Sequence, residues 1–217
     1  MLYRATQLIG YPLLRGYFRP EVTGRQFVPA SGAAIMAANH LSAADQVVTP
    51  ISALRQVVYF AKAEYFTEPG LRGRIRARVF RELGHVPVDR DDTRSAAGTI
   101  ETGAELLAAG RVLGIYPEGT RSPDGCLHKF RTGVARLALR SGAPVIPVGL
   151  SGTEAMLRPG DKRWHRAPVA VHFGPPLDFS GRAEDEKSAR ALREVTEQIR
   201  EAVQLLSGQE YIDTYAR

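Results

Sequence analysis

The chain has 217 residues, of which 44% are hydrophobic and 24% charged, a composition that excludes fibrous and disordered classes and fits one globular domain. Its formal net charge of +6 favours an anionic partner, such as acidic lipid headgroups, coenzyme A phosphates, an acidic carrier protein or nucleic acid. The single cysteine excludes an internal disulfide, and no cysteine–histidine cluster has zinc-ligand spacing, so we expect no metal site.

The first 19 residues combine apolar side chains at helical spacing with aromatic residues and arginines. No apolar run approaches the roughly 20 residues needed to cross a bilayer, and Arg15 interrupts the apolar stretch, which argues against a signal peptide. A helix lying at a membrane interface and a helix packed on the core both fit this pattern. We therefore expect residues 1–25 to form an N-terminal amphipathic segment, bent or divided at Pro12, and residues 26–217 to form the main domain.

Apolar runs and helical patterns alternate along the rest of the chain. The expected strands are 33–38, 56–61, 85–88, 111–116, 145–149 and 169–173. The expected helices are 43–54, 69–83, 93–109, 130–140 and, in the tail, 184–207. This alternation predicts an α/β fold, a single-domain sandwich in which helices flank a mostly parallel or mixed sheet. Polar motifs that follow the strands then lie on loops at the sheet edge, where α/β proteins form their sites.

The expected helix 69–83 is strongly basic. Leu71, Ile75 and Val79 fall four residues apart, and arginines at 72, 74, 76, 78 and 81 occupy the other faces. Two interpretations remain open, a solvated helix face and a surface attracted to anionic lipid. Nucleic-acid binding is disfavoured, because few aromatic residues interleave with these arginines and no reader motif is present.

The tail helix 184–207 and the segment before it have different characters. Leu192, Val195, Ile199 and Val203 recur at helical spacing, which predicts a helix packed on the core. Residues 151–167 mix prolines, glycines and charges without a period, so we expect an irregular loop near the site.

The most informative segment is Ala37-Ala-Asn-His-Leu-Ser-Ala-Ala-Asp45. An imidazole, with an ordinary pKa of about 6.5, suits proton transfer near neutrality, and a carboxylate can fix its tautomer. Positions five apart on one helix lie about 140° out of phase, so His40 belongs before a helix and Asp45 in its first turn. Residues Ser42 to Asp45 also fit a capping box with Ser42 as N-cap. Taken alone, the pair is better explained as a cap beside an ordinary loop histidine, because short motifs recur by chance.

Further segments accompany this pair in a specific order. They are Ala61-Lys-Ala-Glu-Tyr-Phe66, Gly84-His-Val-Pro-Val-Asp-Arg90, Ile115-Tyr-Pro-Glu-Gly-Thr-Arg-Ser122, Lys129-Phe-Arg-Thr-Gly133 and Ala143-Pro-Val-Ile-Pro-Val-Gly149. Together with His40-x4-Asp45 they resemble the sequence blocks of the glycerolipid acyltransferase family, the 1-acylglycerol-3-phosphate acyltransferases. The resemblance covers roughly residues 30 to 175. Two features depart from it: Lys129 precedes Phe130 instead of following it, and the helix 69–83 is less apolar than usual.

The resemblance implies a glycerol-3-phosphate acyltransferase-like fold and a set of site residues. His40 would be the general base and Asp45 its partner. The residues implied in substrate binding are Lys62, Arg90, Glu118, Gly119, Thr120, Arg121 and Lys129. Arginine suits this role because its guanidinium matches phosphate bidentately. The alternatives are a surface turn with a Glu118–Arg121 ion pair, a solvated strand end at Arg90, and solvated lysines.

The implied reaction moves an acyl group from acyl-CoA or acyl carrier protein, as co-substrate, to the free hydroxyl of a lysophospholipid, most simply 1-acylglycerol 3-phosphate to give phosphatidic acid. Other acceptors, among them glycerol 3-phosphate, other lysophospholipids and glycolipids, remain open, as does a non-catalytic basic membrane-binding module. No Gly-x-Ser-x-Gly elbow is present, and Cys126 lies in a turn-like stretch, which favours direct transfer without an acyl-enzyme. We expect no other cofactor and a peripheral position on the cytoplasmic face of an anionic membrane. The sequence does not indicate an oligomeric state.

Overall fold

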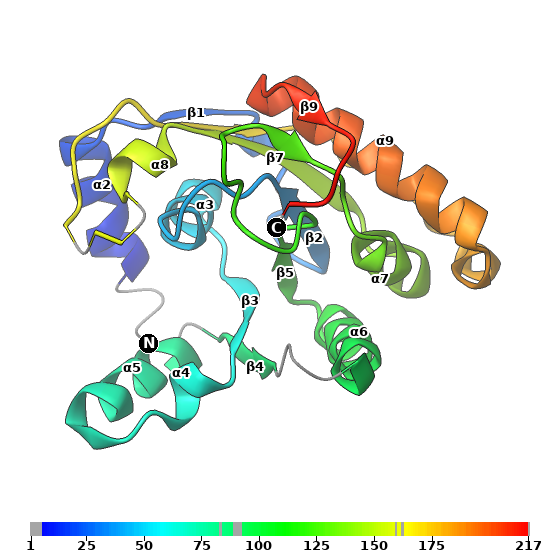
Figure 1. Cartoon of the computed structure of the whole chain (residues 1–217), viewed down its shortest axis with the longest axis horizontal. Coiled ribbons are helices and arrows are strands. Elements are labelled where there is room, and N and C mark those ends of the chain that lie inside the picture. Colours follow the sequence, from blue (N-terminus) through cyan, green and yellow to red (C-terminus); the bar gives the residue numbers. More distant parts are fainter. Residues whose placement is uncertain (1–5, 83, 89–92, 159, 162, 217) are drawn as a thin grey trace.

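The computed structural model describes residues 6–82, 84–88, 93–158, 160–161 and 163–216, in which helices cover both faces of a seven-stranded sheet (Figure 1). The strands are β1 (Glu21–Thr23), β2 (Ala34–Ala38), β3 (Val57–Lys62), β4 (Val86–Val88), β5 (Val112–Ile115), β7 (Val145–Ser151) and β8 (Ala170–Phe173). Their order is β1-β8-β7-β2-β5-β3-β4. From β7 to β4 all neighbours are parallel, whereas β8 runs antiparallel to β7 and β1 parallel to β8. The predicted α/β fold with a mixed sheet is confirmed.

Helices form a layer on each side of this sheet. They are η1 (Thr6–Gly10), α2 (Tyr11–Tyr17), η2 (Arg25–Phe27), α3 (Asp45–Ala53), α4 (Glu64–Thr67), α5 (Gly70–Glu82), α6 (Thr93–Ala108), α7 (Gly133–Ser141), α8 (Thr153–Met156), η3 (Ala183–Lys187) and α9 (Ala189–Ser207). Successive side chains of β2 point to opposite faces, so Met36 packs in the core on the α3 side and Ile35 in the core beneath α7 and α9. The central strands are therefore buried on both faces, which explains their continuous apolar runs.

The tail helix α9 closes one face of the sheet. Its stripe Leu192, Val195, Ile199 and Val203 is buried, as predicted, and each such side chain stabilises the fold by about 1.5–3 kcal/mol. The carboxyl end of α9 approaches β7 closely at Gly149, where a Cβ atom would lie 2.4 Å from the Leu206 carbonyl carbon. A glycine at this strand position is therefore required by the contact.

Short elements account for most differences from the sequence expectation. The strand β1 lies inside the N-terminal segment 1–25, and a small two-stranded sheet joins β6 (Leu127–His128) to β9 (Tyr211–Ile212). These three strands have only two or three residues and show no alternating pattern, so they were not expected, whereas the equally short β4 lies in the expected strand 85–88. The predicted helix 130–140 begins only at Gly133, in α7.

In the described part of the N-terminal segment the π-helical turn η1 ends at Gly10 and α2 follows directly, with Pro12 in its first turn. Leu8, Ile9, Leu13 and Tyr17 are exposed, whereas Phe18 packs against the core on the α3 side. Within the described ranges no helix has the length and apolar character required to span a bilayer.

Candidate active site

The candidate site lies where β2 and β5, which are neighbours in the sheet, end at the same edge. His40 follows β2 by two residues and Tyr116 directly follows β5. Their rings stack with centroids 3.9 Å apart and planes inclined by 14°. The parallel topology thus brings together two motifs that are 76 residues apart in the sequence.

A buried carboxylate orients the His40 ring. Asp45 is fully buried, and its Oδ2 accepts a hydrogen bond from His40 Nδ1 at 2.8 Å. The same oxygen accepts the backbone N–H groups of Leu41 and Ser42, at 2.8 and 2.9 Å. Since an ionised carboxylate only accepts, this bond requires the proton on Nδ1, and in the neutral ring the lone pair is then on Nε2. The two residues predicted to act together are therefore in contact, with a basic nitrogen on the far side of the ring.

The predicted N-cap at Ser42 is wrong, although Asp45 Oδ2 accepts the Ser42 N–H at 2.9 Å, as in a capping box. The helix α3 begins at Asp45 after Ala44, without a side-chain cap. Ser42 Oγ instead donates to the Leu157 carbonyl at 2.8 Å and accepts the Ala44 N–H at 3.2 Å. The Asp45 carboxylate binds the loop that carries His40, so the serine is free to anchor that loop to the segment 151–167. The bond to Leu157 places this predicted irregular segment beside the site, although it also contains the short helix α8.

A second buried carboxylate fixes the backbone on both sides of the site. Glu118 is fully buried; its Oε1 accepts the His40 N–H at 2.9 Å and its Oε2 accepts the His128 N–H at 3.0 Å. The Ser122 N–H donates to the His40 carbonyl at 2.7 Å. Burial raises the pKa of Glu118 to about 7, although the two backbone N–H groups act in the opposite direction. The alternative of a surface ion pair between Glu118 and Arg121 does not fit this geometry.

Asn39, which the sequence reasoning missed, fixes the end of β2. Its Nδ2 donates to the Leu150 carbonyl at 2.9 Å and to Gln209 Oε1 at 2.8 Å, and its Oδ1 accepts the Leu150 N–H at 2.8 Å. A fully buried amide beside His40 therefore ties the site to β7 and to the C-terminal segment. The sequence signal for Asn39 was its amide at the end of an otherwise apolar strand, because a buried amide requires hydrogen-bond partners.

The other predicted binding residues lie around this centre. Gly119, Thr120 and Arg121 are exposed on the loop after Glu118, and Lys62 is exposed at the end of β3. Gly119 has a positive φ of 83°, and a Cβ there would lie 2.7 Å from Arg131 Nε, so the turn requires glycine. Arg90 lies outside the described residues.

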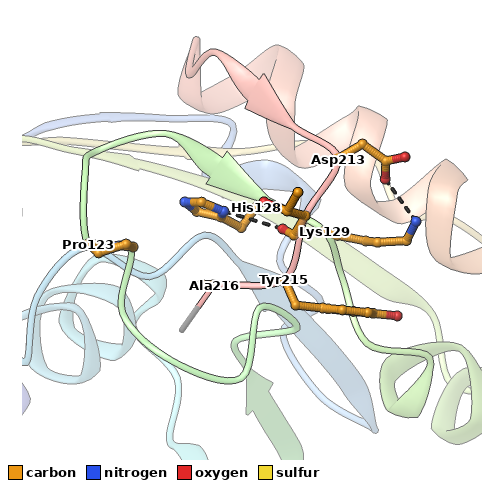
Figure 2. Close-up of a pocket in the computed structure, with 7 residues that line it drawn as sticks. Pro123, His128, Lys129, Asp213, Tyr215 and Ala216 are labelled. Atoms are coloured by element: carbon orange, nitrogen blue, oxygen red, sulfur yellow. Dashed lines mark hydrogen bonds and ion pairs between the residues drawn. The ribbon is translucent and has the colours of Figure 1, made fainter.

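Lys129 lines a pocket of about 660 Å³ (Figure 2). The lining residues are Pro123, His128, Lys129, Asp213, Thr214, Tyr215 and Ala216. Lys129 Nζ bonds Asp213 Oδ1 at 2.9 Å, and the partly exposed Tyr215 ring lies beneath the Arg131 guanidinium at 5.2 Å. The pocket is connected to the centre through Glu118, which holds the backbone of both His128 and His40.

Comparisons with known proteins agree with this arrangement. Residues 19–151 match the family model described as Acyltransferase. The chain is 29% identical over 175 residues to the chloroplastic 1-acyl-sn-glycerol-3-phosphate acyltransferase BAT2 of Brassica napus, covering 75% of this chain and 48% of the relative. It is 30% identical over 156 residues to the 1-acyl-sn-glycerol-3-phosphate acyltransferase of Escherichia coli (strain K12), covering 71% and 61%. The chain thus spans about half the length of the curated relatives it matches first.

A solved structure supports the same relationship across nearly the whole chain. The crystal structure of the 1-acyl-sn-glycerophosphate (LPA) acyltransferase PlsC from Thermotoga maritima superimposes with a TM-score of 0.71 at 25% identity, covering 94% of this chain and 79% of that one. The family model alone spans more than half of the residues. From its sequence match and its fold, this chain belongs to the Acyltransferase family and is PlsC-like.

Proposed function

We propose that this chain transfers a fatty acyl group from acyl-CoA or acyl carrier protein to the free hydroxyl of 1-acylglycerol 3-phosphate, giving phosphatidic acid. The observation that carries the proposal is the 2.8 Å contact between His40 Nδ1 and the buried Asp45, which leaves a basic nitrogen at the sheet edge. The names of the relatives support this acceptor, because they are 1-acyl-sn-glycerol-3-phosphate acyltransferases.

In the proposed mechanism His40 acts as a general base. Nε2 takes the proton of the acceptor hydroxyl as its oxygen attacks the thioester carbonyl, while Asp45 stabilises the imidazolium. The tetrahedral intermediate expels the thiolate, which receives the proton back from His40 to leave a free thiol and the ester. Ser122 and Glu118 hold the His40 backbone from both sides, so the ring needs little reorganisation before reaction.

For the acceptor phosphate we propose Arg121 and Arg90 as the main contacts. Arg121 is exposed three residues after the buried Glu118, and the positive φ of Gly119 turns the loop between them. Glu118 itself has both oxygens bound to backbone N–H groups, so its proposed role is to hold His40 rather than to touch substrate. Lys129, at its pocket, and Lys62, at the end of β3, are further proposed contacts.

We further propose that the chain docks on an anionic membrane surface through α5. Its apolar residues Leu71, Ile75 and Val79 are exposed by 68%, 56% and 38%. The exposed arginines beside them are Arg72, Arg74, Arg78 and Arg81. The exposed apolar residues of η1 and α2 belong to the same proposal. Arginines that flank exposed apolar side chains fit the boundary between headgroups and acyl chains. The position on the cytoplasmic face stays a prediction.

Product identification by mass spectrometry tests the reaction. Purified protein is given acyl-CoA with an equimolar mixture of lysophospholipids, glycerol 3-phosphate and a glycolipid, and we expect phosphatidic acid as the main acylated product. His40→Ala, shown to be folded by circular dichroism, should give no product above background. Thiol release that does not require an acceptor would identify a thioesterase instead, and acylation by His40→Ala would contradict the proposed base.

A further inference from the structure

A column of three aromatic rings lies beneath the proposed base. The His40 ring stacks on Tyr116 at 3.9 Å, and Tyr116 stacks on Tyr59 at 5.5 Å with planes only 7° apart. Space for this column comes from Gly114, where a Cβ would lie 2.2 Å from the Tyr59 ring. Any side chain in this part of β5 would displace Tyr59 and with it the support under His40, so the strand sequence itself is adapted to the stack.

The buried hydroxyl groups of this column lie within the electrostatic influence of Asp45. In the described part of the chain, Tyr116 Oη, Thr49 Oγ1 and Asp45 Oδ1 are all buried without a hydrogen-bond partner of good geometry. The Tyr59 hydroxyl faces those of Tyr116 and Thr49, and the Asp45 charge acts on both phenols. Burial raises the pKa of both tyrosines, so each phenol stays protonated and is able to donate.

These groups are chemically complementary. A buried carboxylate oxygen without a donor is costly, and so is a buried hydroxyl without an acceptor. Tyr116 and Thr49 can donate, Asp45 Oδ1 can only accept, and all three atoms are buried without a partner, so a bond or a bridging water between a hydroxyl and Oδ1 would satisfy them together. Asp45 Oδ2 already accepts three N–H donors on the His40 side, so a donor at Oδ1 would fix the orientation of the carboxylate.

We propose that Tyr116 is a positioning residue for His40. Its ring packs against the imidazole, and its hydroxyl group, together with that of Thr49, orients the Asp45 carboxylate through Oδ1. This inference rests on the proposed acyl transfer. The ring restricts rotation of His40 about its side-chain bonds, and the two hydroxyl groups keep Oδ2 aimed at Nδ1. Tyr116 touches no substrate; it acts on the reaction only by fixing the base and its partner.

The two contributions separate in a short series of variants. Tyr116→Phe and Thr49→Val each remove one hydroxyl and keep the shape, and we expect each to lower kcat about fivefold with KM for both substrates unchanged. Tyr116→Leu removes ring and hydroxyl, with an expected loss of about 30-fold that Tyr116→Phe largely restores. Thr196→Val is the matched control, because Thr196 is a buried helix threonine on α9 whose hydroxyl bonds the Leu192 carbonyl. Its kcat should equal that of the unaltered protein.

A second readout is independent of catalysis. The proton between His40 Nδ1 and Asp45 should give a low-field proton resonance in the NMR spectrum, absent from Asp45→Ala. We expect Tyr116→Phe and Thr196→Val to keep this resonance, and Tyr116→Leu to broaden or shift it. Failure of the proposed function would show as no turnover by the unaltered protein, with this resonance series intact. An unchanged resonance in Tyr116→Leu, or unchanged kcat in Tyr116→Phe and Thr49→Val, would overturn the positioning role.

Discussion

The sheet-edge site and the α4–α5 region differ in how far their charged side chains are buried. At the site, Asp45 and Glu118 are fully buried and accept backbone and side-chain N–H groups at distances of 2.8 to 3.0 Å. On α5 most arginines are exposed, and Arg76 forms an ion pair with Glu68. Buried charges with fixed donors act over short distances and resist salt, whereas exposed charges act collectively and are screened. Substitutions of the buried charges at the site should therefore have large, salt-independent effects, and substitutions of the exposed arginines on α5 small, salt-dependent ones.

The largest effect is expected from Asp45→Asn. An asparagine has no negative charge to stabilise the imidazolium, and its single amide oxygen is a weaker acceptor for the three N–H groups that all bind Asp45 Oδ2. We expect kcat to fall by about 10² to 10⁴, measured with saturating substrates. Because the pair acts as a unit, adding His40→Ala to this variant should cause little further loss. Fully additive losses would show that the two residues act separately.

Glu118→Gln should change how stability depends on pH. An unfolded glutamate titrates near about 4.3, whereas burial raises the pKa of Glu118 to about 7, so the folded chain binds this proton more tightly than the unfolded chain. The free energy of unfolding therefore decreases as pH rises from about 4.3 through 7, by on the order of 3 kcal/mol from this group. Glutamine does not titrate, so this decrease should be absent in the variant.

Urea unfolding of both proteins at pH 5, 6, 7 and 8 measures the difference. The variant should be less stable at pH 5 by about 1–3 kcal/mol, because one amide oxygen cannot accept both backbone N–H groups. The difference in the free energy of unfolding between the two proteins should become smaller toward pH 8. Glu105→Gln, at an exposed position on α6, is the control, and its free energy of unfolding should depend on pH as that of the unaltered protein does. A parallel curve for Glu118→Gln would contradict the raised pKa.

Arg121→Ala should act on substrate binding. If its guanidinium binds the acceptor phosphate, the lost charge-assisted hydrogen bonds should raise the KM for the acceptor about tenfold to 100-fold and leave the KM for the acyl donor nearly unchanged. Arg121→Lys keeps a point charge without the planar fork and should fall between the two. Steady-state kinetics with each substrate varied in turn measures both constants. Equal increases for donor and acceptor would contradict phosphate recognition at this residue.

Residues close in sequence made half of the site predictable. His40 and Asp45 lie five positions apart, so their contact follows from a strand ending and a helix beginning between them. The same locality misled the prediction of the Ser42 cap, because the competing partner, Leu157, is 115 residues away. The strand runs were predictable because strands buried on both faces are apolar throughout.

The remaining half depends on contacts that only the folded chain creates. Glu118 bonds a residue 78 positions before it, and Asn39 bonds Gln209, 170 positions after it. The aromatic column requires Gly114, Tyr59 and Tyr116 to meet across neighbouring strands. Strand order and register decide these contacts, and neither is written in hydrophobic periodicity. The sequence pattern therefore implied a binding role for Glu118, because it does not indicate that this carboxylate is buried.

The smallest effects are expected on α5, and they test whether its exposed charges work collectively. Arg74→Ser should weaken binding to anionic vesicles about fivefold at low salt, less at high salt, and not at all for neutral vesicles. Ile75→Ser should weaken binding equally at both salt concentrations, because apolar burial is not screened. Matched controls lie on α9, on the other side of the molecule (Figure 1): Arg190→Ser and Leu205→Ser, both exposed. If these controls weaken vesicle binding as much as the α5 variants, attraction comes from the net charge of +6 as a whole and not from a docking helix.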